Sequence, residues 1–335
     1  QFAFVIYDVN KRALFAARDQ VGIVPLYFVR DGQTLFIASI IKALTHLGKK
    51  IRAVPPGHTL DIHGNLKPYY FPGYGGGALS REAFVGELKQ ALQTAVAKRV
   101  DTDLPVGVIY SGGIDSSVVL HEASQRHGDV TAFTIGTSDS EDFEISGRFC
   151  QEWNIPQIVI PLQHRDIRRH DIKHTIQVTE LNEYLDIINA VISLPLFERI
   201  HEAGVKVVLG GDGSDELFGG YHMYQHIPRE DEAQLFLHNL MTLHKTELQR
   251  VDRCSMAHEV EVRVPFLDLR VVELALQMPM AWKINHGVEK WAVREAFRDE
   301  LPAYIIQRRK NPLSYSSGLH EWVRMYKILY ARYYN

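Results

Sequence analysis

Small residues and one carboxylate interrupt an apolar run in the stretch GVIYSGGIDSSVVL, from Gly107 to Leu120. The apolar residues before the interruption are typical of a buried strand, and those after it have the spacing of a helix's inner face. Ser111, Gly112 and Gly113 are therefore expected where a strand turns into a helix. Free backbone N–H groups and the helix dipole favour an anion at such a junction. The simpler alternative is a tight turn with a helix N-cap.

Neither of two common phosphate-binding loops is present, because the stretch contains no GxxxxGK[ST] and no GxGxxG. SGGIDSS instead resembles the signature of the ATP pyrophosphatases, which cleave ATP between its α- and β-phosphates to adenylate a substrate. That resemblance implies that the glycines and serines bind pyrophosphate and that Asp115 binds Mg2+. The residue types suit these roles, since small residues let the backbone approach, hydroxyls donate, and Mg2+ prefers carboxylate oxygens.

A second loop, GGDGSDELFGGY from Gly210 to Tyr221, follows another apolar strand. Its three carboxylates, Asp212, Asp215 and Glu216, could hold a metal or act on charged phosphates. An exposed acidic turn is the alternative, but the apolar pair Leu217-Phe218 is expected to hold such a turn against a core.

Basic residues cluster in two later segments, one around Lys290 in EKWAVRE and one beginning at Arg308 in RRKNPLSYSSG. Fixed cations near the carboxyl ends of a nucleotide-binding sheet suit the neutralisation of pyrophosphate. Each segment taken alone is better explained as a solvated basic surface, so the order of the segments along the chain decides between the two interpretations.

The elements that must position these residues change in character near residue 72. Short strand-like segments separated by the turn signals Asp31-Gly32 and His63-Gly64 predict antiparallel strands before it. Strands at 104–110, 130–136, 155–161 and 205–211 then alternate with helices, and residues 232–300 are mostly helical. This alternation predicts an α/β fold with a parallel sheet, helices on both of its faces, and ligands beyond the strands' carboxyl ends. We expect two domains, residues 1–73 and 74–335.

The order of the motifs resembles one family. SGGIDSS, GGDGSDELFGGY, DRCSMAHEVEVRVPFLD, KWAVREAF and RRK are similar to the synthetase domain of glutamine-dependent asparagine synthetases, over residues 80–325. Upstream, AARDQVGIVPLYF, PPGHTLDI and KPYYF resemble the later half of that family's glutaminase domain, an N-terminal-nucleophile fold. The expected fold is thus an ATP pyrophosphatase-like domain preceded by a partial, antiparallel glutaminase-type domain.

The resemblance implies an enzyme that uses ATP and Mg2+ in two steps. An aspartate-like carboxylate attacks the α-phosphate to give an acyl adenylate, and a nitrogen nucleophile then displaces AMP. Lys310 would stabilise negative charge during adenylation, Asp212 would face the reacting centre, and Asp215 would be a second Mg2+ ligand beside Asp115. The implied nucleotide-binding residues are Ile109, Ser111, Gly112, Gly113, Asp115, Ser116, Ile135, Gly210, Gly211 and Lys290.

Two departures leave the acyl acceptor and the nitrogen source open. The family's glutaminase requires an N-terminal cysteine, whereas this chain begins QFAF and both of its cysteines lie in the synthetase half. The nitrogen source is therefore glutamine, if a preceding segment supplies the glutaminase, free ammonia, or an internal amine. β-Lactam synthetases and lasso-peptide cyclases share this scaffold and close rings, although the β-lactam branch has a tyrosine at the position of Asp212. The stretch Asn182 to Phe197 also differs from the usual substrate-binding stretch.

Composition and charge limit the classes of binding partner and the cellular location that we expect. The net charge of −3 gives no general attraction to nucleic acid or membranes. Cys150 and Cys254 have neither disulfide-framework nor zinc spacing. Neither a signal peptide nor a membrane span is expected, and a cytoplasmic enzyme is predicted. The family resemblance suggests a homodimer.

Overall fold

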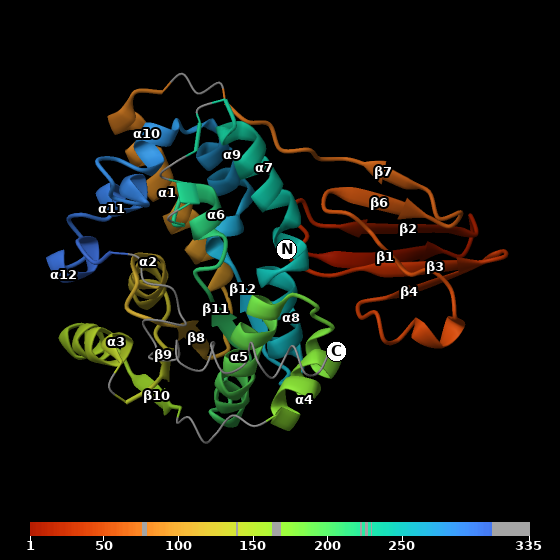
Figure 1. The fold of residues 1–335 in the computed structure, drawn as a ribbon, viewed down its shortest axis with the longest axis horizontal. Helices are drawn as coiled ribbons and strands as arrows, with labels where there is room; N and C mark the ends of the chain where they lie inside the picture. Colours follow the sequence, from red (N-terminus) through yellow and green to blue (C-terminus); the bar gives the residue numbers. More distant parts are fainter. Residues whose placement is uncertain are drawn as a thin grey trace.

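The computed structural model describes residues 1–75, 79–138, 140–162, 169–221, 223–224, 227–228 and 230–309. Figure 1 shows the antiparallel strands of the first 68 residues beside a larger body in which helices surround a sheet.

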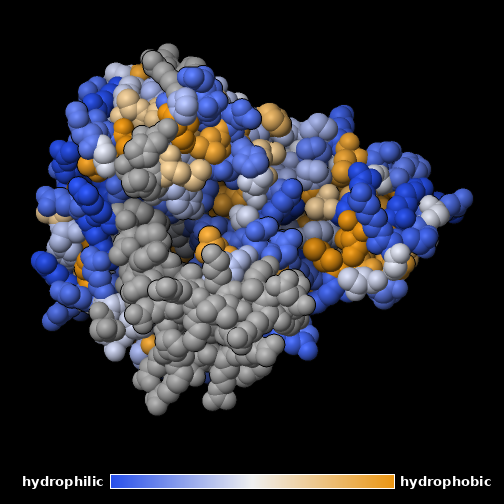
Figure 2. Space-filling model, viewed as in Figure 1, coloured by the Kyte–Doolittle hydropathy of each residue, from blue (hydrophilic) through white to orange (hydrophobic). Residues whose placement is uncertain are grey.

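The first part of the chain forms antiparallel sheets, as predicted. A four-stranded sheet has the order β1 (Ala3–Asp8), β2 (Ala13–Arg18), β6 (His58–Asp61), β7 (Leu66–Pro68), and a three-stranded sheet has the order β4 (Thr34–Ala38), β3 (Tyr27–Asp31), β5 (Arg52–Ala53). The turn signal at Asp31-Gly32 joins β3 to β4, with Gly32 in the left-handed region at φ 58°. Apolar side chains of β1 are exposed, and Figure 2 shows hydrophobic residues gathered over these strands.

The parallel sheet has five strands in the order β10 (Gln157–Pro161), β9 (Val130–Gly136), β8 (Val106–Ile109), β11 (Val207–Leu209), β12 (Glu261–Arg263). All neighbouring pairs are parallel. Four of these strands match the predicted ones. The fifth, β12, lies in a region that is otherwise helical, and three residues are too few to give a recognisable alternation.

Helices cover both faces of this sheet, as the alternating pattern predicts. Figure 1 shows α2 (Ile114–Ser124) and α3 (Glu141–Glu152) on one side, and α5 (Tyr184–Glu202) and α8 (Glu247–Met256) on the other. Ser80 caps α1, accepting a hydrogen bond from the Ala83 N–H at 3.3 Å. The remaining helices are α1 (Arg81–Arg99), α4 (Arg169–Thr179), α6 (Ser214–Phe218), α7 (Glu232–Thr242), α9 (Leu269–Gln277), α10 (Met280–Lys283), α11 (Trp291–Ala296) and α12 (Ala303–Ile306), with 3₁₀ turns η1 (Thr45–Leu47), η4 (Leu243–Lys245) and η5 (Pro265–Leu267).

Strand order sets the position of the ligand site. The chain moves outward from β8 through β9 to β10 and then returns to add β11 on the other side of β8. The connections therefore diverge between β8 and β11, and the loops that follow these strands border the gap. Such a switch point is where open α/β sheets bind ligands.

The two parts of the molecule contact each other through polar and apolar groups. The Glu180 carboxylate, at the end of α4, accepts hydrogen bonds from the backbone N–H groups of Ile41 and Lys42 at 2.9 and 2.6 Å. Val21 and Ile23 join the hydrophobic core that surrounds the parallel sheet. The segment between β7 and α1 also contacts the larger part, since the Gly75 N–H donates to the Leu276 carbonyl at 2.9 Å.

Candidate active site

The two predicted loops lie side by side. Ser111 to Gly113 follow β8, Gly210 to Gly213 follow β11, and Val108 pairs with Leu209 in the sheet. A Cβ added to Gly211 would lie 3.0 Å from the Asp115 Cβ, which shows how closely the loops approach. Gly211 therefore borders the start of α2.

The Ser111 loop has the geometry of an anion-binding turn. The hydroxyl oxygens of Ser111 and Ser116 are 3.3 Å apart, and the Ser111 N–H donates to the Ser116 Oγ at 3.3 Å. Gly112 is left-handed, with φ 69°, and Gly113 precedes α2 without a side chain to cap it. The first turn of α2 thus keeps its N–H groups for a ligand. Ile109 at the end of β8 and Ile135 in β9 lie on the adjacent strands.

The acidic loop is held rigidly. A glycine in the left-handed conformation stands at each end of α6, Gly213 with φ 89° before it and Gly219 with φ 74° after it. Leu217 and Phe218 are buried, so the prediction that they anchor the turn in the core is confirmed. Asp215, in the first turn of α6, consequently projects from a short helix of fixed position.

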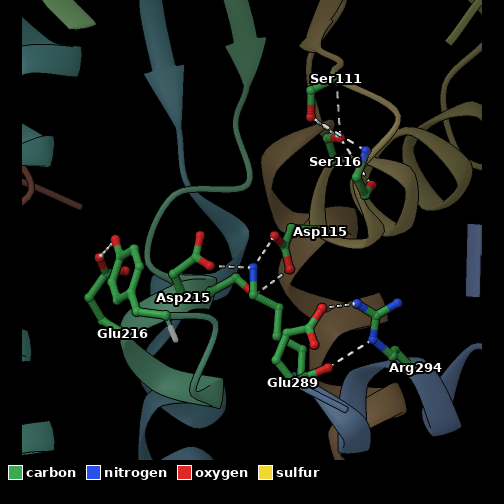
Figure 3. A network of polar contacts seen from close by, with 11 residues as sticks. Ser111, Asp115, Ser116, Asp215, Glu216, Glu289 and Arg294 are labelled. Carbon is green, nitrogen blue, oxygen red and sulfur yellow. Dashed lines mark hydrogen bonds and ion pairs between the residues drawn. The ribbon is translucent and has the colours of Figure 1, made fainter. Parts of the chain in front are cut away.

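Lys290 joins the two loops. Its ammonium group forms ion pairs with Asp115 and with Asp215, the latter at 2.8 Å, and its side chain is 0% exposed. Figure 3 shows the carboxylates of Asp115 and Asp215 pointing toward each other from different elements. Ser214 Oγ donates to the second oxygen of Asp115 at 2.5 Å. A Cβ at Gly220 would lie 1.9 Å from Asp215 Oδ1, so a glycine is needed there.

Arg294 fixes the turn that carries Lys290. Its NH2 group donates to Glu289 Oε1 and its Nε to the Glu289 carbonyl, both at 2.8 Å. Its NH1 group reaches the Ile306 carbonyl at 2.7 Å, just before the basic segment at Arg308. Lys290 itself has a left-handed backbone, with φ 55°, a strained conformation that this network holds in place.

Asp212 lies in a neighbouring charged cluster. Arg250 of α8 is 3.8 Å from Asp212 Oδ1 and 3.8 Å from Glu247 Oε1. The same arginine donates to Ser193 Oγ of α5 at 3.1 Å. Ser193 belongs to the stretch 182–197, so Arg250 connects that stretch to the acidic loop. Sequence analysis did not single out Arg250, because one arginine in a helical segment carries no distinguishing signal.

The acidic loop also contains a buried acid. Burial, together with the nearby Glu247 and Asp215 carboxylates, raises the pKa of Glu216 to about 8. The Tyr221 hydroxyl donates to Glu216 Oε1 at 2.5 Å. Glu216 is thus a protonated acid near neutral pH.

A second buried lysine supports α6 from behind. Lys283 donates to the Leu217 carbonyl at 2.7 Å and to the Ala275 carbonyl at 2.6 Å, and its Nζ lies 4.1 Å from the Phe236 ring centroid. Burial lowers its pKa to about 7. Lys283 thus donates to one carbonyl in the last turn of α6 and to one in the last turn of α9. Lys310, the remaining predicted site residue, lies outside the described residues.

The donor set suits a divalent cation. Asp115 and Asp215 direct carboxylate oxygens at one point, and Mg2+ is commonly held by one or two carboxylates together with substrate phosphates. Within the described ranges no group of three or more His, Cys, Asp and Glu side chains forms a metal cluster. Asp115 and Asp215 could therefore supply two of the oxygen ligands that such a cation requires.

The chain matches two family models. Residues 87–237 and 228–333 match the asparagine synthase model, and residues 1–46 match a glutamine amidotransferase domain. No helix among the described residues is long and apolar enough to cross a membrane. A U34-tRNA thiolase, NcsA from Methanococcus maripaludis, overlaps 78% of this chain and 86% of its own at 16% identity, with a TM-score of only 0.35.

Named relatives agree with the family models. Glutamine-hydrolysing asparagine synthetase 2 of Arabidopsis thaliana is 32% identical over 96% of this chain and 59% of its own length. A putative asparagine synthetase 1 of Methanocaldococcus jannaschii is 30% identical over 98% of this chain and 70% of its own, and asparagine synthetase B of Escherichia coli is 31% identical over 99% and 63%. The chain spans about 59% of the first of these. The chain belongs to the asparagine synthase family.

Proposed function

We propose that this chain is an ATP-dependent ligase that adenylates a substrate carboxylate, transfers nitrogen to it, and releases AMP and pyrophosphate. The observation that carries the proposal is the meeting of Asp115, Asp215 and Lys290. They come from three separate motifs and converge at the switch point of the parallel sheet. Paired carboxylates and a buried cation are the groups that phosphoryl chemistry requires. Relatives named glutamine-hydrolysing asparagine synthetases give the cyclase alternative no support.

In this proposal the loop after β8 binds the nucleotide. Backbone N–H groups of Gly112 and Gly113, with the hydroxyls of Ser111 and Ser116, hold the β- and γ-phosphates. Lys290 neutralises the pyrophosphate as a carboxylate oxygen attacks the α-phosphorus and the bond to pyrophosphate breaks. Lys310 stabilises the same developing charge. Ile109 and Ile135 border the adenine, and Gly210 and Gly211 line the nucleotide.

Mg2+ is the metal we propose for the two aspartates. Asp115 and Asp215 would hold it, and when bound it would neutralise charge on the phosphate oxygens. In the ligand-free protein the Lys290 ammonium group pairs with both of these carboxylates and holds them close together.

The acyl acceptor is proposed to lie on the Asp212 side. Arg250 offers a buried guanidinium to a carboxylate, and Asp212 faces the reacting carbon. In the second step a nitrogen nucleophile forms the C–N bond, AMP leaves, and the nitrogen loses a proton. We propose aspartate as the carboxylate and glutamine as the nitrogen source, because residues 1–46 match an amidotransferase domain. The division into domains at residue 73 remains a prediction.

Pyrophosphate release tests the function. The chain is assayed with ATP, Mg2+ and aspartate or other amino-acid carboxylates, each with and without ammonia. We expect release that depends on aspartate and asparagine formation that depends on ammonia. A product formed without any added amine would show ring closure instead. No pyrophosphate release with any carboxylate would contradict the proposal.

A further inference from the structure

Arg308 begins the basic segment RRK, and its side chain joins two elements that are distant in sequence. Its NH1 group donates to the Ser111 carbonyl at 2.9 Å, and its NH2 group donates to Asp142 Oδ1 at 2.8 Å. A further ion pair links its Nε to Glu141 at 3.4 Å. The side chains of Arg308 and Asp142 are only 8% and 1% exposed. One guanidinium thus connects the loop after β8 to the first turn of α3.

The contact with Ser111 has a consequence for the next residue. The Ser111 carbonyl and the Gly112 N–H belong to one planar trans peptide group, in which the C=O and N–H bonds point in opposite directions. A donor that holds the carbonyl therefore also sets the direction of the N–H. A Cβ at Gly112 would lie 2.8 Å from Ile145 Cγ2 and 3.1 Å from Arg308 NH1, so the peptide is enclosed by α3 and the arginine.

We propose that Arg308 is a positioning residue for nucleotide binding, which holds the Ser111 carbonyl and thereby aims the Gly112 N–H at the β- and γ-phosphates. This inference rests on the proposed function, because it requires ATP to bind at the loop. An arginine is needed because its planar fork supplies two donors at a fixed separation, one for the carbonyl and one for Asp142. A lysine has a single nitrogen and cannot span both acceptors in the same geometry.

The test compares the same conservative change at neighbouring positions. Arg308→Lys and Arg309→Lys both keep the charge, but Arg309 is exposed and serves as the matched control. Binding of ATP with Mg2+ and of AMP is measured by isothermal titration calorimetry on the full chain. We expect Arg308→Lys to weaken ATP binding about tenfold, the effect of losing a hydrogen bond to a charged group, while AMP binding changes little. Arg309→Lys should match the wild type for both ligands.

A second variant separates positioning from general stability. Asp142→Asn removes the charge that holds Arg308 from the other side, and it should also lower the ratio of ATP affinity to AMP affinity. An Arg308→Lys chain that keeps the wild-type ratio, or that loses affinity for both ligands equally, would overturn the inference. A wild-type chain that binds AMP but not ATP, or neither, would contradict the proposed function as well. If the wild-type chain binds ATP and the Arg308→Lys chain has the same ratio of ATP affinity to AMP affinity, only this inference is contradicted and the proposed function stands.

Discussion

Strand β8 of the parallel sheet and strand β1 of the antiparallel sheets are both apolar in sequence, yet they differ in burial. Val106 and Val108 of β8 are fully buried beneath the helices, whereas Val5, Ile6 and Tyr7 of β1 are exposed. Figure 2 shows hydrophobic surface over the strands of this part of the chain. The difference shows that an apolar sequence can predict a strand, but it does not show which other element, if any, packs on that strand. The proposed site lies where helices cover the strands.

The largest difference between the regions should come from matched lysine substitutions. Lys290→Met removes the buried cation between two partly buried carboxylates, and we expect a loss of about 3–5 kcal/mol in the free energy of unfolding. Pyrophosphate release should fall about a hundredfold or more. Urea unfolding and the pyrophosphate assay measure these effects. Mg2+ should recover part of the stability, because it can take the place of the ammonium group between Asp115 and Asp215.

Lys49→Met is the matched control in the antiparallel part. The Lys49 side chain is 52% exposed and pairs with Asp31 at 3.2 Å on the surface. Such pairs contribute about 1 kcal/mol or less, so neither stability nor pyrophosphate release should change appreciably. Equal effects of the two substitutions would remove the electrostatic distinction between the regions.

Core truncations should differ next. Leu120→Ala, in α2 with 0% of the side chain exposed, is expected to cost about 2–5 kcal/mol because it leaves a cavity. Ile6→Ala in β1, where the side chain is 55% exposed, should change the free energy of unfolding by about 0.5 kcal/mol or less. Urea unfolding of both variants measures the contrast. A large loss at Ile6 would mean that β1 is covered in solution.

Left-handed glycines provide a smaller contrast. Gly213→Ala combines φ 89° with a Cβ that would lie 2.4 Å from Leu267, so strain and overpacking should together cost about 2–4 kcal/mol. Gly32→Ala has φ 58° and no atom within 4 Å of the added Cβ, and should cost about 1–2 kcal/mol from backbone strain alone. Thermal unfolding compares the two. Similar losses would show that the packing around Gly213 is loose.

The smallest predicted effect is a difference in the sign of pH dependence. Glu216, with its pKa raised from 4.5 to about 8, stays protonated in the folded chain while the unfolded chain ionises. Its contribution to stability should therefore fall as the pH rises from about 4.5 to 8. Glu216→Gln should flatten this fall in urea titrations run without Mg2+. An unchanged slope in the variant would exclude Glu216 as its source.

Asp61 in the antiparallel part should act in the opposite direction. Although desolvation opposes it, hydrogen bonds from Asn65 and His63 lower the pKa of Asp61. That stabilisation is present above the unfolded pKa of about 3.8 and is lost as the pH falls through the lower folded value. Asp61→Asn should remove it, as measured by unfolding between pH 2 and 5. A fall that persists in the variant would point to other carboxylates.

Much of the site could be predicted from short-range patterns. The junction at Ser111 is recognisable because an apolar run, small residues and a helix follow one another within fourteen positions. The anchoring of the acidic loop follows from Leu217 and Phe218 next to Asp215. Each of these inferences uses neighbours along the chain, where residue type and spacing carry the physical information.

The supporting cations could not be predicted in the same way. Arg250 and Lys283 lie in helical segments where basic residues are ordinarily solvated, and their roles arise only when distant elements bury them. Arg308 could be linked to phosphate chemistry, but its acceptors, Ser111 and Asp142, are 197 and 166 residues away. Long-range burial decides these roles, and no local pattern reports it.

The two glycines that end α6 also limit insertions and deletions in the acidic loop. With a left-handed glycine at each end, this helix has five residues and no flexible turn to absorb an extra one. One residue inserted between Gly213 and Asp215 would rotate the following side chains by about 100° around the helix axis. The Asp215 carboxylate would then point away from Lys290. Insertions and deletions are therefore excluded from this loop more strictly than substitutions are.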